Sequence, residues 1–289
     1  MKSQIAQTMK GPIEYTLNGH GPALLVCHGT SENCHSGRAL APLLDAGFSI
    51  LTISRPGYGR TPSSVGSSNI EAADALVALL DQLEVSQCSV IAISGGGPTG
   101  IALAANYPER VKGLVLIAAN TYTENRHNDP GYQSQKAFYG PLHGLFWGML
   151  RMFSMLSPRR TALQTLAIFS THDPKDTMSR LSSEDIRTLS YFFHGHSSRE
   201  GALNDLTHVV TRELMQGVLT PALIIHSRED ASIPFHHAEW SIKHIPNARL
   251  CESGCTGHFY WIGPDFPRIC ESMINFLRTN VVQIGQIVR

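Results

Sequence analysis

The sequence lacks the features that mark several other classes of protein. It has no apolar run of the about 18 residues that a membrane-spanning helix needs, and its first residues, MKSQIAQTMK, contain no apolar signal-peptide core. It also has no excess of charge, because 23 Lys and Arg residues balance 23 Asp and Glu residues, so nothing in this total indicates binding to nucleic acid or to an anionic membrane. We therefore expect a cytoplasmic protein without a membrane span, with a small-molecule substrate and no nucleic-acid partner.

Regular cysteine spacing is missing as well. The six cysteines are scattered along the chain, and several lie in apolar runs, where a thiol behaves as a small hydrophobic side chain. One cluster, Cys251, Cys255 and His258, offers three zinc ligands, but its spacing differs from that of common zinc sites and no fourth ligand is evident. We expect free thiols, no metal and no other cofactor.

What the chain does contain is a regular alternation of apolar runs and amphipathic helical patterns. Apolar runs rich in Val, Ile and Leu, with little polar alternation, are typical of parallel strands that are covered on both faces. Such runs occupy 23–27, 48–53, 88–93 and 113–119. Helical patterns lie between them at 69–83 and 98–110. This order predicts an α/β protein with a doubly wound, mostly parallel central sheet and right-handed crossovers.

The alternation stops after Asn120, where helical segments replace the strands. Strands and helices of the first kind resume near the C-terminus, at 221–227, 236–245, 248–252 and 266–278. We therefore predict a core of residues 1–120 and 216–289, with a helical cap of residues 121–215 inserted after the sixth strand.

The segment 137–156 is the most lipophilic part of the predicted cap. Its three glycines, proline, histidine and arginine argue against a membrane span. An ordinary buried helix pair and a helix that lines a substrate pocket are both compatible with this segment. In the second case Phe146, Trp147 and Met149 are the candidate substrate-binding residues, and they favour a small or medium apolar group.

The segment ISGGGPTG at 93–100 fits two kinds of site. Its glycines match the G-x-G-x-x-G turn that holds a dinucleotide, whereas Ser94 in the same segment fits a nucleophile on a sharp strand-to-helix turn. A dinucleotide site also needs an acidic residue at the end of the following strand, but that strand ends in Ala119 and Asn120. The sequence therefore favours the nucleophile.

A serine nucleophile of this kind needs an acid after a late strand and then a histidine, in that order along the chain. Asp230 follows a late strand, with Glu229 and Glu252 as alternative acids, and His258 follows the last strand. We expect Ser94 to attack a carbonyl group, His258 to take and return the proton, and Asp230 to orient the imidazole.

Such a reaction also needs preorganised N–H donors for the negative oxygen of the tetrahedral intermediate. The loop His28-Gly29-Thr30 comes directly after the first buried strand, and Gly95 follows the nucleophile. We predict that the Thr30 and Gly95 amides form this oxyanion hole and that His28 is structural.

The sequence resembles the α/β-hydrolase fold superfamily over nearly its whole length. The resemblance rests on HGT, SRPGYGRTP, AISGGGPTGIALAANYPERVKGLVLIAA, SREDASIP and TGHFYWIG. It implies a serine hydrolase with a helical cap that cleaves a carboxylic ester, lactone or thioester through an acyl-enzyme. The chain departs from the usual pattern at Ala92, where the family has glycine, and at Ser54, where it has aspartate. We expect Ala92 to fit the turn and Ser54 to change only how its loop is anchored.

Two alternatives stay open from the sequence. One is a small-molecule receptor or pseudoenzyme with the same fold, and the other is a C–C hydrolase or perhydrolase that uses the same triad. Dehalogenases and epoxide hydrolases of this fold are disfavoured, because they carry aspartate at the position of Ser94. The natural substrate is not fixed by the sequence, and a homodimer is one possible assembly.

Overall fold

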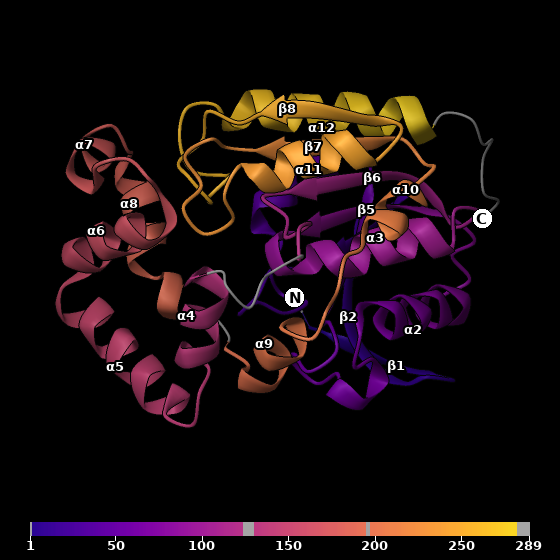
Figure 1. Ribbon diagram of the computed structural model, residues 1–289, viewed down its shortest axis with the longest axis horizontal. Helices are drawn as coiled ribbons and strands as arrows, with labels where there is room; N and C mark the ends of the chain where they lie inside the picture. Colours follow the sequence, from indigo (N-terminus) through magenta and orange to yellow (C-terminus); the bar gives the residue numbers. More distant parts are fainter. Residues whose placement is uncertain (1, 124–129, 195–196, 282–289) are drawn as a thin grey trace.

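The computed structural model describes residues 2–123, 130–194 and 197–281 and contains an eight-stranded sheet flanked by helices (Figure 1). The strands lie in the order β1-β2-β4-β3-β5-β6-β7-β8. The β1–β2 and β2–β4 pairs are antiparallel, and the other pairs are parallel. The bounds are β1 Gln4–Thr8, β2 Gly11–Asn18, β3 Ala23–Cys27, β4 Ser49–Ile53, β5 Cys88–Ile93, β6 Val111–Ile117, β7 Ala222–His226 and β8 Ala248–Glu252. The predicted α/β fold with a mostly parallel sheet is confirmed.

Helices cover both faces of this sheet, which explains the apolar character of its central strands. On one face, the apolar side chains of β3, β5 and β6 pack against α2 (Asn69–Gln82), α3 (Gly97–Asn106) and α11 (His236–His244). On the other face they pack against α1 (Ala41–Asp45) and α12 (Phe266–Val281). Strands buried on both sides need apolar residues at successive positions, because alternate side chains point to opposite faces.

The chain between β6 and β7 forms helices, of which the last is α10 (Arg212–Gln216). Their bounds are α4 Pro130–Phe138, α5 His143–Leu156, α6 Pro158–Phe169, α7 Pro174–Ser179, α8 Ser183–Ser190 and α9 Arg199–Asp205. Figure 1 shows α4–α8 gathered at one end of the sheet, whereas α9 lies beside the core. A small apolar cluster joins α6, α7 and α8 to Phe259 and Ile262 of the core.

The chain has buried thiols and no candidate membrane helix in the part that the structure describes. All six cysteines are free and five of them are buried, as predicted for thiols that fill apolar space. No helix among the described residues combines the length and apolar character needed to cross a bilayer.

Helix α3 lies unusually close to strand β5, and Gly100 makes this approach possible. A Cβ atom at Gly100 would stand 2.5 Å from the Cβ of Ala92 and 3.4 Å from Cγ1 of Val90. The absence of a side chain at this position therefore fixes the distance between the helix and the strand that flank Ser94.

Replacing Gly100 by alanine should destabilise the fold. Overpacking of a filled core costs about 1–3 kcal/mol, so we expect the free energy of unfolding of Gly100→Ala to fall by about this amount in urea titrations. The control is Gly148→Ala in α5, where a Cβ would meet no atom within 4 Å. Because alanine is favoured over glycine in a helix by up to about 1 kcal/mol, this variant should be slightly stabilised. Equal destabilisation of both variants would contradict the close approach.

Candidate active site

Ser94 stands on a sharp turn between β5 and α3. Its φ of +49° lies in the left-handed region that non-glycine residues rarely adopt, and the N–H of Asn120 donates to its carbonyl at 3.0 Å. Positions 96 and 97 favour glycine, because a Cβ at Gly97 would stand 2.8 Å from the carbonyl oxygen of Asn120 and one at Gly96 would collide with the carbonyl oxygen of Cys27. Backbone strain of this kind is typical of functional sites.

The substitution of alanine for the family's glycine two residues before the nucleophile is accommodated by the same turn. The methyl group of Ala92 faces Gly100, whose missing side chain leaves the space it needs. Ala92 therefore fits the turn, as predicted from the sequence.

The structure brings Ser94, Asp230 and His258 together from three separate loops. Nε2 of His258 lies 3.0 Å from Oγ of Ser94, and Nδ1 lies 2.7 Å from Oδ2 of Asp230. The other carboxylate oxygen of Asp230 accepts the N–H groups of Ser232 and Ile233, both at 2.8 Å. Because Asp230 accepts the Nδ1 proton, Nε2 is left to accept the proton of the serine hydroxyl.

The surroundings of His258 set its basicity. Burial alone would lower the pKa of His258, but the charge and hydrogen bond of Asp230, with a further contribution from the charge of Glu32, outweigh burial and raise it. An imidazole with a raised pKa accepts a proton more readily, and the buried carboxylate stabilises the imidazolium that forms.

The two alternative acids from the sequence bond to other partners. Glu229 pairs with His172, and Glu252 accepts a hydrogen bond from Nε of Arg228 at 2.9 Å. Asp230 is therefore the acid that contacts His258 in this arrangement.

An aromatic ring that the sequence analysis did not identify covers His258. The ring of Phe169, at the end of α6, stacks on the imidazole with 5.7 Å between centroids, and its carbonyl accepts the His258 N–H at 3.0 Å. Phe192 and Phe259 pack against Phe169 in turn. This apolar contact shields one side of the imidazole from water, and no local motif distinguishes Phe169 from the other aromatic residues of the helical region.

The hydrogen bonds and ring contacts that the described residues make with His258 come from Ser94, Asp230, Phe169 and Phe259, and not from the three candidate substrate-binding residues of α5. Trp147 is buried against Phe138 and His143, whereas Phe146 is 40% exposed and Met149 is 37% exposed. Their role in binding substrate stays a prediction.

The two amides predicted for the oxyanion hole lie next to each other. A Cβ at Gly95 would overlap Oγ1 of Thr30 and stand 3.3 Å from the Thr30 nitrogen, so a side chain at this position would collide with this loop. The Gly95 N–H is in the first turn of a helical segment and has no partner within that segment. Among the described residues, the Thr30 N–H also has no acceptor. Both amides are available to an oxygen near Ser94.

The loop that carries Thr30 is held by a carboxylate that the sequence analysis did not single out. Glu32 accepts the N–H of Gly29 at 2.8 Å, and its Oε2 and the Cβ of Ser94 both lie within 3.4 Å of the point where a Gly29 Cβ would stand. Burial raises the pKa of Glu32. The carboxyl group therefore lies beside the nucleophile as well as beneath the loop.

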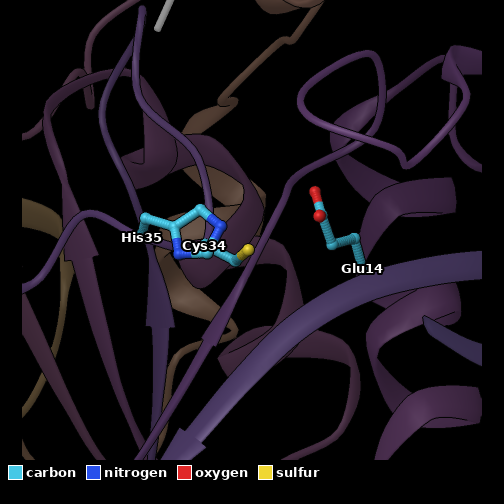
Figure 2. A group of neighbouring side chains, drawn as sticks. All are labelled: Glu14, Cys34 and His35. Carbon is cyan, nitrogen blue, oxygen red and sulfur yellow. The ribbon is translucent and has the colours of Figure 1, made fainter. Parts of the chain in front are cut away.

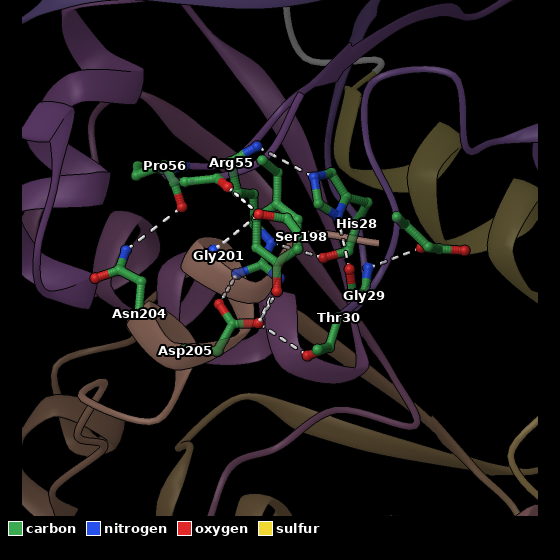
Figure 3. A network of polar contacts seen from close by, with 12 residues as sticks. His28, Gly29, Thr30, Arg55, Pro56, Ser198, Gly201, Asn204 and Asp205 are labelled. Atoms are coloured by element: carbon green, nitrogen blue, oxygen red, sulfur yellow. Dashed lines mark hydrogen bonds and ion pairs between the residues drawn. The ribbon is translucent and has the colours of Figure 1, made fainter. Parts of the chain in front are cut away.

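His28 and Arg55 connect this loop to the core (Figure 3). The backbone N–H of Arg55 donates to Nε2 of His28 at 3.1 Å, and Nδ1 of His28 contacts the Gly29 carbonyl at 2.7 Å. Burial and the charge of Arg55 lower the pKa of His28 to about 3. His28 is therefore neutral with both ring nitrogens engaged, in agreement with a structural role.

The guanidinium of Arg55 is fully buried and forms a two-point ion pair with Asp205, the last residue of α9. Nη1 and Nη2 lie 2.5 Å and 2.9 Å from the two carboxylate oxygens, and Nε donates to the His28 carbonyl at 2.7 Å. Planar pairing of this kind fixes geometry as well as charge. Sequence analysis missed Asp205, because its partner lies 150 positions earlier in the chain.

Glu14 of β2 supplies a carboxylate to the loop in which Ser54 replaces the family's aspartate. Its Oε2 accepts the Ser54 hydroxyl at 2.8 Å and the N–H of Arg60 at 2.9 Å. Its Oε1 accepts the side chains of Ser3 and Arg60, both at 2.7 Å. The loop thus keeps an acidic anchor, which comes from another strand.

Glu14 also lies near Cys34 and His35, and each of the three offers one atom that could bind a metal ion (Figure 2). Both oxygens of Glu14 already accept hydrogen bonds, and burial raises the pKa of the Cys34 thiol. A metal ligand has to be deprotonated and free to coordinate, so these residues fit a structural anchor better than a metal centre.

Comparison with known proteins identifies the family of this chain. A family model described as alpha/beta hydrolase fold matches residues 22–262. The chain is 34% identical over 272 residues to the uncharacterized hydrolase YcgS of Bacillus subtilis, covering 93% of this chain and 96% of YcgS. It is 26% identical over 258 residues to a pimeloyl-(acyl-carrier protein) methyl ester esterase of Nitrosomonas europaea, covering 85% and 92%.

Among solved structures, an alpha/beta hydrolase fold protein from Nakamurella multipartita superposes with a TM-score of 0.78 at 23% identity, covering 96% of this chain and 99% of that one. This likeness concerns the fold. The match over residues 22–262 and the 34% identity to YcgS show that the chain belongs to the α/β-hydrolase fold family.

Proposed function

We propose that this protein is a serine hydrolase that cleaves a carboxylic ester, lactone or thioester of a small, rather apolar substrate through an acyl-enzyme. The observation that carries this proposal is the hydrogen-bonded chain of three side chains. Oγ of Ser94 lies 3.0 Å from Nε2 of His258, and Nδ1 of His258 lies 2.7 Å from Oδ2 of the buried Asp230. The relatives named as a hydrolase and an ester esterase support it.

In this mechanism neutral His258 takes the proton of Ser94 as its oxygen attacks the carbonyl carbon. The negative oxygen of the tetrahedral intermediate faces the Thr30 and Gly95 amides. His258 then gives its proton to the leaving group, which departs and leaves the acyl-enzyme. His258 next takes a proton from water, whose oxygen attacks the acyl carbon, and then returns that proton to the oxygen of Ser94 as the acid leaves. Asp230 orients the imidazole and stabilises the imidazolium in both steps.

The groups around the nucleophile favour a neutral and apolar substrate. Phe169 lies against His258, and two carboxyl groups, those of Asp230 and Glu32, are close to the reacting residues. The buried guanidinium of Arg55 is already paired with Asp205. An anionic group next to the scissile bond would therefore lie beside an apolar ring and two carboxyl groups, without a free arginine at this position to balance its charge.

We further propose that residues 121–215 form a cap over a core of residues 1–120 and 216–289. The end of α6 supports this, because the Phe169 carbonyl accepts the His258 N–H and the N–H of Thr171 donates to the backbone carbonyl of Glu229. A cytoplasmic location is in keeping with six free cysteines, since thiols stay reduced there.

Ser94 can be tested by covalent labelling and by substitution. A fluorophosphonate should label Ser94 stoichiometrically, and Ser94→Ala should lose labelling and at least about a thousandfold in kcat/KM on short-chain aryl esters, because the nucleophile is removed. Ser272→Ala, on a partly exposed position of α12, is the control and should keep both properties.

The other outcomes separate the alternatives. Labelling of Ser94 without ester turnover would favour a receptor, whereas turnover of a vinylogous diketone or of peroxide in place of esters would favour a C–C hydrolase or a perhydrolase. Folded protein that is not labelled at Ser94 would contradict the triad.

The pH dependence of kcat/KM follows from His258. The imidazole has to be neutral to take the serine proton, so activity is present above its pKa and is lost as the pH falls through it. Because Asp230 raises this pKa above 6.5, the midpoint of the acidic limb should lie above pH 6.5. Ester hydrolysis across pH, with circular dichroism to show that the protein stays folded, checks this. A midpoint below 6.5 in folded protein would show that Asp230 does not act on His258 in this way.

A further inference from the structure

Asp205 has more hydrogen-bond partners than an ion pair requires. Besides the two guanidinium contacts with Arg55, its Oδ2 accepts the hydroxyl of Tyr58 at 2.7 Å and that of Thr30 at 2.8 Å (Figure 3). The same oxygen lies 3.0 Å from the point where a Gly95 Cβ would stand. The carboxylate thus bonds to the segment that carries Thr30 and lies close to the segment that carries Gly95.

We propose that Asp205 is a positioning residue for the oxyanion hole: by accepting the Thr30 hydroxyl, it fixes the direction of the Thr30 amide. This inference rests on the proposed serine-hydrolase function. It means that a residue from the chain segment between β6 and β7 completes a site whose reacting groups all belong to the core.

The charge of Asp205 has to be balanced for this role, because an unpaired carboxylate here would repel the developing oxyanion. Burial alone would raise the pKa of Asp205, but the charge and hydrogen bonds of Arg55 outweigh burial and lower it. Asp205 therefore stays ionised and accepts the hydrogen bond that the Thr30 hydroxyl donates. The guanidinium, with a side chain 1% exposed, neutralises its charge at 2.5–2.9 Å.

The helix that carries Asp205 is docked rigidly on the core. A Cβ at Gly57, where φ is +84°, would stand 2.7 Å from Cα of Gly201, and one at Gly201 would stand 2.5 Å from the ring of Tyr58. Asn204 donates to the Gly66 carbonyl at 2.9 Å. Two glycines thus allow α9 to lie directly on the loop after β4, so Asp205 keeps a fixed distance from Thr30.

The test removes the hydroxyl of Thr30 and leaves both its amide and the Arg55–Asp205 pair in place. Complete loss of one oxyanion donor lowers kcat by about 10²–10³, so misalignment in Thr30→Val should lower kcat by about tenfold to a hundredfold with little change in KM. Thr30→Ser keeps the hydroxyl and should stay within about threefold of the native enzyme. Thr165→Val removes a buried hydroxyl that donates within α6 and serves as the control for general loss of packing.

A binding measurement separates positioning from a merely structural effect. An aryl trifluoromethyl ketone forms a tetrahedral adduct with the nucleophile and places its oxygen in the oxyanion hole. Its Kd should therefore weaken in Thr30→Val by the same factor as kcat/KM, whereas substrate KM should not.

The outcomes are distinct. Full kcat and unchanged ketone affinity in folded Thr30→Val would overturn the role of Asp205 while leaving the proposed function intact. An equal loss in Thr165→Val would do the same, since it would assign the effect to packing. Native protein that neither hydrolyses esters nor reacts with the ketone would overturn the proposed function and this inference together.

Discussion

The arrangement of the site depends on one constraint, the reversal of the chain at Ser94 between β5 and α3. A non-glycine residue with φ of +49° costs about 1–2 kcal/mol, and the surrounding structure has to enforce that conformation. The sheet contributes, because β5 is buried on both of its faces. Three glycines, Gly96, Gly97 and Gly100, also contribute, because their lack of side chains lets neighbouring backbone carbonyls and the Ala92 methyl group pack against the turn. The strain holds the hydroxyl away from the sheet and toward His258.

A second constraint operates between distant parts of the chain. Burying a guanidinium and a carboxylate is unfavourable unless geometry and hydrogen bonding are complete, and even then such a pair is weak evidence for stability. The Arg55–Asp205 pair meets those conditions, with further contacts to His28, Tyr58 and Thr30. We therefore assign the pair a positioning role: it holds together the loop after β3, the loop after β4 and helix α9, close to the nucleophile.

The sequence was sufficient for the elements and residues that have strong local signals. The strands predicted at 23–27, 48–53, 88–93 and 113–119 agree with β3 to β6 within two residues, because strands buried on both faces are almost wholly apolar. Ser94, Asp230 and His258 could be selected since the fold places their loops in a fixed order along the chain. Their meeting in space is an observation of the structure, and their catalytic roles stay predictions.

The residues that sequence analysis missed have no local signal. In β2 the buried Glu14 and Thr16 break the apolar pattern, so the positions of β2 and its neighbour β1 were not predicted. Glu14, Phe169 and Asp205 gain their roles only through partners that lie far away in the chain. The lipophilic segment 137–156 drew attention to α5, yet Phe146 and Met149 are partly exposed there. Composition shows that a helix is apolar but not which way it faces.

The contrast between two histidines shows how such long-range contacts decide chemistry. Both His28 and His258 follow a strand of the sheet and lie in the loops around Ser94. The chain has 14 histidines, so residue type alone does not distinguish these two from the others. Burial and the positive charge of Arg55 lower the pKa of His28 to about 3, and its Nε2 already accepts an N–H. His258 faces the buried carboxylate of Asp230, which raises the pKa of the imidazole, and its Nε2 points toward the hydroxyl of Ser94. An imidazole thus serves as a neutral structural group beside an arginine, and another has the surroundings of a base beside an aspartate.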